Sequence, residues 1–477
     1  MESIYESLIQ FMWPEICIAL SAIVILLSSL FIKKRGVLTA ISAVGIIGSA
    51  VLDFICLQQY SDTGITYASY MLSADTATFY FRLLFAGIAL FVVLGSYDYA
   101  KNFEKFHAEY LVLIHLALLG MTLLVSSFNI ISLFVSLELM ALSFYGLTAL
   151  MKDQKSSEAA LKYILLGGIN SAVLLFGLVL LYGFTGETTF NNIGYTIAMG
   201  GSSEAGLIFA LVLIVAGFSF KIAGVPFHMW APDVYEGSPT SVTLYLSTAS
   251  KLAGMGVLFR IMYSIFAYSP SVSNKLMLAL AVISVLSMCV GNLGAIAQSS
   301  VKKMLAFSGI AQSGYMLLGV IAILLTGGSG AYSIFTALFI FALAFALAEI
   351  AAFTGVFSFS DAIKSDNIQD FRGVAKRSPF IAIVITIGLL SLMGLPVTGG
   401  FIGKFGVFSV VGNIPLIIIG VINSVISAVY YLRFIRVMWT GEPNEEGVID
   451  CSILPYVIMT CAATLVIAIG IFGFKFI

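Results

Sequence analysis

Charged side chains are scarce in this chain: they make up 10% of its 477 residues, whereas hydrophobic residues make up 60%. A soluble domain carries roughly 25% charged residues, so the composition excludes an ordinary water-soluble protein. The net charge of −1 and the lack of long basic runs also exclude nucleic acid as an expected partner. The chain is therefore predicted to fold in a lipid bilayer.

Cysteine and histidine are also sparse. The five cysteines, Cys17, Cys56, Cys289, Cys451 and Cys461, form no CxxC pair and do not cluster with any of the three histidines. Iron–sulfur clusters and structural zinc need grouped thiolate or imidazole ligands, and the histidines are too dispersed for paired haem ligands. Neither a GxGxxG turn nor a P-loop is present. We therefore expect no cofactor and no metal in this chain.

Long apolar runs occupy most of the sequence. Runs of about 20 apolar residues, enough to cross a hydrocarbon core of roughly 30 Å, occur about fourteen times. Lys and Arg gather in alternate connecting loops, the first of which contains Lys33, Lys34 and Arg35. Because positive residues stay cytoplasmic in short loops, both termini are expected on the outer side, which requires an even number of spans. The sequence thus predicts an all-α polytopic membrane protein with about fourteen transmembrane helices.

Two of the late apolar runs contain a proline beside glycines. Pro226 lies in FKIAGVPFH and Pro396 lies in GLPVTGGFIGKF. Proline removes a helix hydrogen bond and glycine loosens the backbone, so each run is predicted to be a broken helix. About five spans separate the two prolines, and an odd number of spans per repeat inverts the second copy, as in many transporters. The spacing therefore indicates an inverted repeat.

Four charged residues interrupt or border apolar runs of membrane-spanning length: Glu138, Lys221, Lys251 and Lys404. A charge at the bilayer centre costs a few kcal/mol or more, so such a group should face polar groups or water inside the protein. Glu138 lies about ten residues, or roughly 15 Å, from either end of its run, where a short carboxylate cannot reach the surface. Lys251 is similarly deep. These positions are typical of a protein that moves charge.

Structural roles remain open for each lysine. Lys221, just before the first break, could hold two helices together, and Lys251 could belong to a structural ion pair. Lys404, just after the second break, could extend to the outer surface. Lys162 lies a few residues inside the cytoplasmic end of its run and could do the same there.

Other charged residues lie in or near apolar runs. Arg82 and Arg260 stand towards the outer ends of their runs and are interpreted mainly as interface anchors. Among the acidic residues Glu15, Asp53 and Glu349, the last is the strongest functional candidate.

Lysine and glutamate together suit proton transfer inside a membrane. Desolvation lowers the pKa of a lysine from about 10.4, and a nearby carboxylate raises it again. A Glu–Lys pair whose separation changes therefore binds and releases a proton. Glu138, Lys221, Lys251 and Lys404 would supply one such switch and two relay stations.

Several motifs point to a known family. LFVSLELMALSFYGL, EAALKYILLGG, FKIAGVPFHMWAPDVYEGSPTSVTLYLSTASKLAG and GLPVTGGFIGKF together resemble subunit N of the proton-pumping NADH–quinone oxidoreductase, respiratory complex I. This subunit belongs to the antiporter-like subunits and is the counterpart of mitochondrial subunit 2. The resemblance extends from PEI near Pro14 to Lys404, and its most specific part is Phe220 to Pro239. Sister subunit M usually has Glu where Lys404 stands, and the D-type protein of multisubunit Na⁺/H⁺ antiporters lacks the PDVYEGSP wording.

The resemblance implies a fold with two inverted five-helix repeats. The repeats would be 109–265 and 275–436, preceded by three helices in 1–100 and followed by one helix in 453–477.

The resemblance also implies roles for the charged residues. Carried over by motif, Glu138 and Lys221 would be the coupling pair, Lys251 the central relay, and Lys404 the station of the second half-channel. Lys162, in the EAALKY motif, would be an accessory proton carrier. Gln312 stands in FSGIAQSGY where many family members have His, so a titrating histidine is not expected there.

The resemblance further implies a subunit of an H⁺-translocating NADH:quinone oxidoreductase that performs no redox chemistry itself. Flavin, iron–sulfur clusters and quinone are expected in partner subunits, and the expected partners are membrane-arm subunits like M, K, L and J. The expected location is the plasma or inner membrane. The alternative is a D-type component of a multisubunit Na⁺/H⁺ antiporter, and a plain membrane scaffold is a third possibility.

Overall fold

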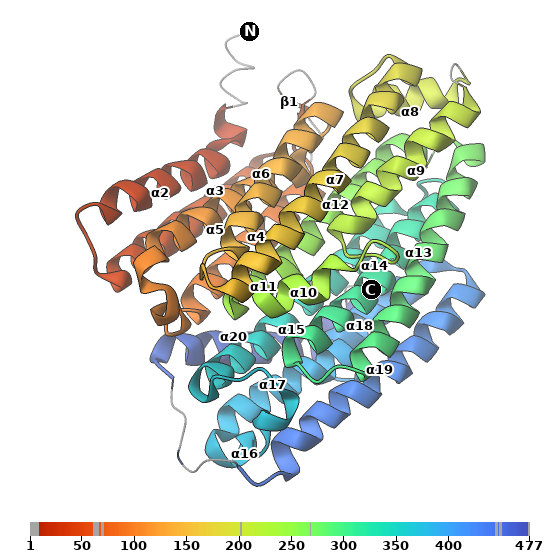
Figure 1. Cartoon of the computed structure of the whole chain (residues 1–477). Coiled ribbons are helices and arrows are strands. Elements are labelled where there is room, and N and C mark those ends of the chain that lie inside the picture. Colours follow the sequence, from red (N-terminus) through yellow and green to blue (C-terminus); the bar gives the residue numbers. More distant parts are fainter. Residues whose placement is uncertain are drawn as a thin grey trace.

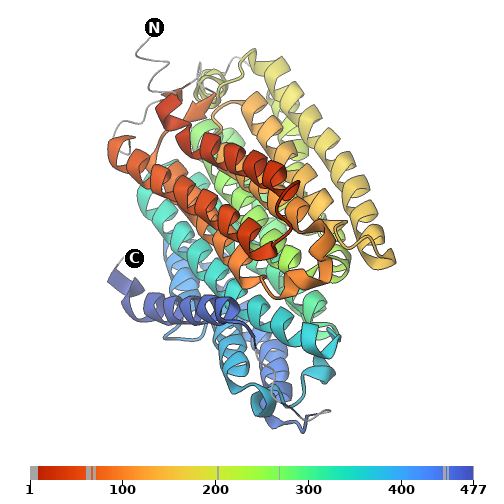
Figure 2. The same ribbon diagram turned by 90° about the vertical axis from the view of Figure 1, so that its left-hand side faces the viewer.

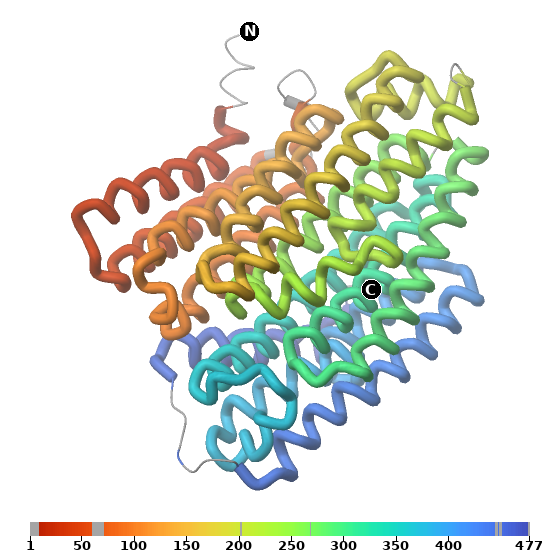
Figure 3. Tube along the Cα trace, viewed as in Figure 1, coloured from red at the N-terminus to blue at the C-terminus, as the bar shows by residue number. Residues whose placement is uncertain are grey.

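The computed structural model describes residues 9–60, 66–67, 71–200, 203–267, 269–443, 447 and 451–475. Within these ranges the chain is a bundle of α-helices with one two-stranded antiparallel pair, β1 (Thr66–Tyr67) and β2 (Leu72–Ser73). The all-α prediction is confirmed. In Figures 1 and 3 the first two helices lie at one side of the bundle and the helices of residues 374–440 at the opposite side, whereas the last helix returns to pack against earlier helices.

Fourteen membrane crossings can be counted among the described residues. Twelve helices are long and apolar enough to span a membrane, and three shorter apolar helices accompany them. The shorter ones are α2 (Trp13–Ser29), α17 (Pro379–Met393) and α18 (Gly399–Val411). Because α17 and α18 follow each other directly, they count as two halves of one crossing, which brings the total to the predicted fourteen.

The remaining elements follow in chain order. The first half contains α3 (Arg35–Tyr60), α4 (Thr76–Gly95), η1 (Tyr99–Phe106), α5 (His107–Ser126), α6 (Ile130–Thr148), α7 (Gln154–Thr185), α8 (Phe190–Ala198), α9 (Glu204–Lys221) and α10 (Trp230–Gly237). One long span then combines α11 (Thr240–Tyr245), η2 (Leu246–Ser250), α12 (Lys251–Ile261) and η3 (Met262–Phe266). The second half contains α13 (Pro270–Ile296), α14 (Val301–Leu325), α15 (Ala331–Ile363), η4 (Ile368–Phe371), α16 (Val374–Arg377), α19 (Ile414–Thr440), α20 (Ile453–Phe472) and η5 (Gly473–Lys475).

Helix ends are marked by the residue types that local chemistry favours. The side chains of Asp75, Asn129 and Asp153 accept backbone N–H groups at the starts of α4, α6 and α7. Such caps satisfy donors that the first helical turn leaves free. Gly394 closes α17 with a left-handed backbone, φ 88°, which glycine adopts without a steric penalty.

The centre of the bundle is formed by three spans. Thr240–Phe266 is almost wholly buried by its neighbours, and α14 and α15 are mostly buried, whereas fewer than half of the residues of α3, α19 and α20 are buried. Figure 2 shows α2 and α3 together on an outer face. Polar side chains on the central spans are therefore shielded from lipid by the protein.

Both predicted helix breaks are present. α9 ends at Lys221 and α10 begins at Trp230, so Pro226 lies in the interruption; Pro396 lies between α17 and α18. Neighbouring helices supply partners for the released backbone groups. Ser313 Oγ donates to Ile222 O (2.7 Å), and the Val225 N–H donates to Ser287 Oγ (2.9 Å). A broken helix is tolerated at membrane depth only where protein or water satisfies its backbone, and these bonds meet that condition.

Candidate functional site

The structure places the three predicted relay and coupling lysines inside the bundle. Lys221, Lys251 and Lys404 expose 3%, 2% and 4% of their surface. Glu138 is half-buried. They come from α9, α12, α18 and α6, so four separate spans contribute one ionisable group each.

The Glu138 carboxylate is bound by α7. Ser171 Oγ donates to Glu138 Oε1 at 2.5 Å. The preceding residue, Asn170, donates from Nδ2 to Gly217 O on α9 at 3.0 Å. Gly217 lies one turn before Lys221, so two adjacent residues of α7 connect the carboxylate of α6 to the end of α9.

Lys221 is the last residue of α9, at the point where this span is interrupted. Among the described residues its Nζ has no hydrogen-bond partner. No ion pair within 4.0 Å joins it to the Glu138 carboxylate among the described residues. The bonds of Ser171 and Asn170 nevertheless bring this carboxylate near the last turn of α9.

Lys251 lies among small and aromatic neighbours. Its Nζ lies 5.4 Å from the centre of the Tyr235 ring and has no hydrogen-bond partner among the described residues. Gly309 of α14 lies against the ammonium, and a Cβ added there would collide with Nζ. The turn before Lys251, η2, is a π-helical segment, a geometry that is frequent at functional sites.

Lys404 bonds to the break in its own span. Its Nζ donates to Leu392 O (3.0 Å), Met393 O (3.1 Å) and Ser424 Oγ (3.2 Å). It also lies 4.5 Å from the centre of the Tyr315 ring. The two carbonyls belong to the last turn of α17, where the helix dipole favours a positive charge. The side chain faces inward, so the alternative of an extension to the outer surface is wrong.

Lys162 differs from the other four residues. It is 44% exposed and forms ion pairs with Glu158 (2.9 Å) and Asp233 (3.0 Å). Its position agrees with the surface alternative, and it is not joined to the buried groups. A role as an accessory proton carrier stays a prediction.

Glu349, the strongest of the three acidic candidates in the sequence, lies inside the bundle. It is fully buried on α15, accepts a hydrogen bond from Ser247 Oγ (3.0 Å) and interacts electrostatically with Lys251. The available signal was the same as for Glu138, a carboxylate in the middle of a long apolar run. Hydropathy gives its depth but not the side of the helix on which it lies.

Gln312, the residue at the frequent histidine position, lies beside the second break. Its Nε2 donates to Leu392 O at 2.8 Å. The amide therefore binds the same carbonyl as Lys404 and connects α14 to α17.

A second buried charge cluster lies among the first three helices. Arg82 contacts Glu15 (2.5 Å) and Asp53 (3.4 Å), and donates to Ser126 Oγ (2.8 and 3.0 Å). Arg82 is fully buried. Its interpretation as an interface anchor is wrong, because both carboxylates that pair with it come from the neighbouring helices α2 and α3.

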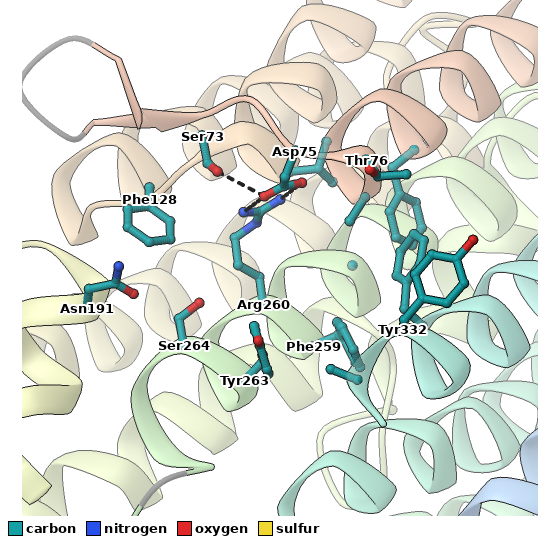
Figure 4. A pocket seen from close by; sticks show the side chains of 16 residues that line it. Ser73, Asp75, Thr76, Phe128, Asn191, Phe259, Arg260, Tyr263, Ser264 and Tyr332 are labelled. Atoms are coloured by element: carbon teal, nitrogen blue, oxygen red, sulfur yellow. Dashed lines mark hydrogen bonds and ion pairs between the residues drawn. The ribbon is translucent and has the colours of Figure 1, made fainter. Parts of the chain in front are cut away.

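Arg260 likewise pairs inside the protein. Its guanidinium binds the Asp75 carboxylate with two bonds, at 2.5 and 2.9 Å, beside a cavity of about 580 Å³ (Figure 4). Burial raises the pKa of Asp75, but the Arg260 guanidinium and the Thr78 N–H outweigh that effect and lower it to about 2. The bond fixes α12 to the start of α4.

The described residues offer no grouping of three or more His, Cys, Asp or Glu side chains that could hold a metal ion.

Comparisons with known proteins show which family this chain resembles. The family described as NADH:quinone oxidoreductase/Mrp antiporter, transmembrane region, matches residues 127–429. NADH-quinone oxidoreductase subunit N of Dehalococcoides mccartyi is 40% identical over 91% of this chain and 90% of that protein.

Solved structures of similar architecture cover almost the whole chain. A chain of respiratory complex I from Thermus thermophilus has a TM-score of 0.78 at 28% identity, covering 96% of this chain and 97% of its own. A chain of an archaeal membrane-bound sulfane sulfur reductase has a TM-score of 0.86 at 25% identity, covering 98% of this chain and 95% of its own. This multi-pass membrane chain therefore belongs to the NADH:quinone oxidoreductase/Mrp antiporter family and, within it, to subunit N of the NADH-quinone oxidoreductases.

Proposed function

We propose that this chain translocates protons as a membrane-arm subunit of a respiratory NADH-quinone oxidoreductase. Quinone reduction in other subunits would supply the conformational or electrostatic signal. The supporting observation is the set of buried ionisable groups, in which the ammonium groups of Lys221 and Lys251 have no bonded partner among the described residues. An unpaired charge is costly in a membrane, and its retention is explained when the group binds and releases protons.

Glu138 and Lys221 would work as a coupling pair. Their separation leaves the interaction free to change, because a small movement of α6 or α7 would bring the carboxylate nearer to the ammonium or take it away. The first movement strengthens the proton affinity of Lys221 and the second weakens it. Lys251 would be the central relay and Lys404 the station of the second half-channel, with Lys162 as an accessory carrier at the surface.

The chain would consist of two inverted repeats, 109–265 and 275–436, between three helices in 1–100 and one in 453–477. Each repeat contains an interrupted helix with a lysine at the interruption, α9–α10 with Lys221 and α17–α18 with Lys404. The alternating positive loops support a topology with both termini on the outer side of the plasma or inner membrane. Subunits resembling M, K, L and J would be the partners, and flavin, iron–sulfur clusters and quinone would be bound elsewhere in the complex.

The decisive experiment replaces Glu138 in the assembled complex. Glu138→Gln removes the charge but keeps the shape, so donor-driven acidification of inverted vesicles should fall severely while assembly is retained. Glu138→Asp should be milder. Wild-type pumping by the Gln variant would refute the role of the pair.

Co-purification separates this function from the alternative. Recovery with flavin and iron–sulfur subunits supports the respiratory function. Recovery with small exchanger subunits alone would instead favour a D-type component of an Na⁺/H⁺ antiporter.

A further inference from the structure

Glu349 lies at a depth in the membrane where a carboxylate without a function would be energetically unfavourable. It lies 18 residues after the first residue of α15 and 14 before the last. At ~1.5 Å per residue, these separations are roughly 27 and 21 Å, so Glu349 is near the middle of the span. Its side chain is fully buried. A charge at such a depth is maintained only by specific neighbours or by function.

One carboxylate oxygen of Glu349 accepts a hydrogen bond, and the other has no hydrogen-bond partner among the described residues. Ser247 Oγ donates to Oε2 at 3.0 Å, while Oε1 has no hydrogen-bond partner among the described residues. Ser247 stands one turn before Lys251 in the same span, so the serine fixes the carboxylate beside the turn that contains this lysine. Glu349 and Lys251 interact electrostatically.

The geometry differs from that of a structural ion pair. Within the same chain, the buried Arg82 and Glu15 are in contact at 2.5 Å. Among the described residues, in contrast, no ion pair within 4.0 Å joins Lys251 Nζ to the Glu349 carboxylate. Two buried charges that do not touch bear the cost of desolvation without the full benefit of contact. That arrangement suits groups that exchange a proton and become neutral together.

Contacts of the neighbouring helix α14 lead from Lys251 towards Lys404. Gly309 of α14 lies against the Lys251 ammonium, and Ser308 precedes it. The Tyr431 hydroxyl is hydrogen-bonded to Ser308 Oγ of α14. One turn further along α14, Gln312 binds the Leu392 carbonyl that Lys404 also binds. Contacts of α14 therefore connect the surroundings of Lys251 with the polar groups around Lys404, and the turn of α15 that contains Glu349 packs against α17, where the Ala348 carbonyl lies against Gly388.

We propose that Glu349 is a proton-carrying residue that exchanges a proton with Lys251 and passes it towards the Lys404 side. This inference rests on the proposed function. In the exchange, a movement of the flexible lysine side chain brings Nζ to hydrogen-bonding distance of Glu349 Oε1. The N–H bond of the Lys251 ammonium then breaks and an O–H bond forms on the Glu349 carboxylate, leaving a neutral amine and a neutral carboxyl. The reverse step restores the two charges, so no net charge is created in the membrane.

The test compares Glu349→Gln, Glu349→Asp and Thr354→Val in the assembled complex. Thr354 is a fully buried residue on the same helix and serves as the packing control. We expect Glu349→Gln to lower donor-driven proton pumping at least tenfold and Thr354→Val to leave it unchanged. Glu349→Asp should pump more slowly, with a displaced pH profile, because the shorter side chain lies farther from Lys251.

Glu138→Gln, measured in parallel, separates the two proposals. If it abolishes pumping while Glu349→Gln pumps normally, the inference about Glu349 is wrong and the proposed function stands. If both variants pump normally, the proposed function itself fails. Where Glu349→Gln does not assemble, Glu349→Asp decides: a displaced pH profile supports the inference, and an unchanged profile overturns it.

Discussion

Lys404 and Gln312 donate to the same backbone oxygen, that of Leu392, at 3.0 and 2.8 Å. The carbonyl belongs to the last turn of α17, where the helix cannot supply its own donor. One of the two donors can lose a proton and the other cannot. The amide of Gln312 therefore keeps the carbonyl satisfied if Lys404 becomes neutral.

Lys404→Arg tests whether this lysine releases its proton. Arginine retains the charge and can still donate to the carbonyls of α17, but it is effectively never deprotonated. We expect the variant to assemble and to lose proton pumping, measured as donor-driven acidification of inverted vesicles. Lys404→Glu should retain partial activity, because a carboxyl group can also titrate. Full pumping by the Arg variant would remove Lys404 from the pathway.

Ser171→Ala tests how the carboxylate of the coupling pair is positioned. The substitution removes the donor to Glu138 Oε1 and leaves the charge in place. A hydrogen bond to a charged group contributes about 1.5–3 kcal/mol, so pumping should fall several-fold and less than in Glu138→Gln. Ser143→Ala, which removes a hydroxyl bonded within its own helix, is the matched control. Equal rates in the Ser171 and Ser143 variants would contradict a positioning role.

Arg82→Met should destabilise the first three helices. The change leaves Glu15 and Asp53 buried without their cation, and breaking such a pair costs about 3–5 kcal/mol. We expect lower yield of the assembled complex and a lower melting temperature. Adding Glu15→Gln and Asp53→Asn to Arg82→Met removes the uncompensated charges and should restore much of the loss. A triple variant as unstable as Arg82→Met would show that the charges are not the cause.

The Asp75–Arg260 bond should make one part of the stability depend on acid. The pKa of Asp75 is about 2 in the folded protein, below the ordinary value of about 3.9 in an unfolded chain. The ionised carboxylate therefore stabilises the fold above about pH 4, and this contribution disappears as the pH falls towards 2. Asp75→Asn should lower the melting temperature at neutral pH. The difference from the wild type should shrink in acid, and a difference independent of pH would contradict the bond's role.

The sequence predicted how deep each charged residue lies in the membrane, but not the side of its helix from which the residue projects. The positions of Pro226 and Pro396 sufficed for the two breaks, because proline excludes a backbone hydrogen bond wherever it stands. The length of the apolar runs sufficed for the crossings. Arg82 was misjudged because its partner Glu15 lies far away in the chain and on another helix. For the same reason the position of Glu349 beside the turn that contains Lys251 could not be predicted. Periodicity gives the face of a helix only when that face differs in polarity, and these spans are apolar on every side.

Gly309 has no functional group, yet it determines the space available to the Lys251 ammonium, since any Cβ there would meet Nζ. Replacement by alanine would add one methyl group, change no charge and remove no hydrogen bond. It would nevertheless force the Lys251 side chain into another rotamer and thereby move the amine that carries the proton. A substitution that impairs function can therefore occur at a residue that has no charged or polar side chain.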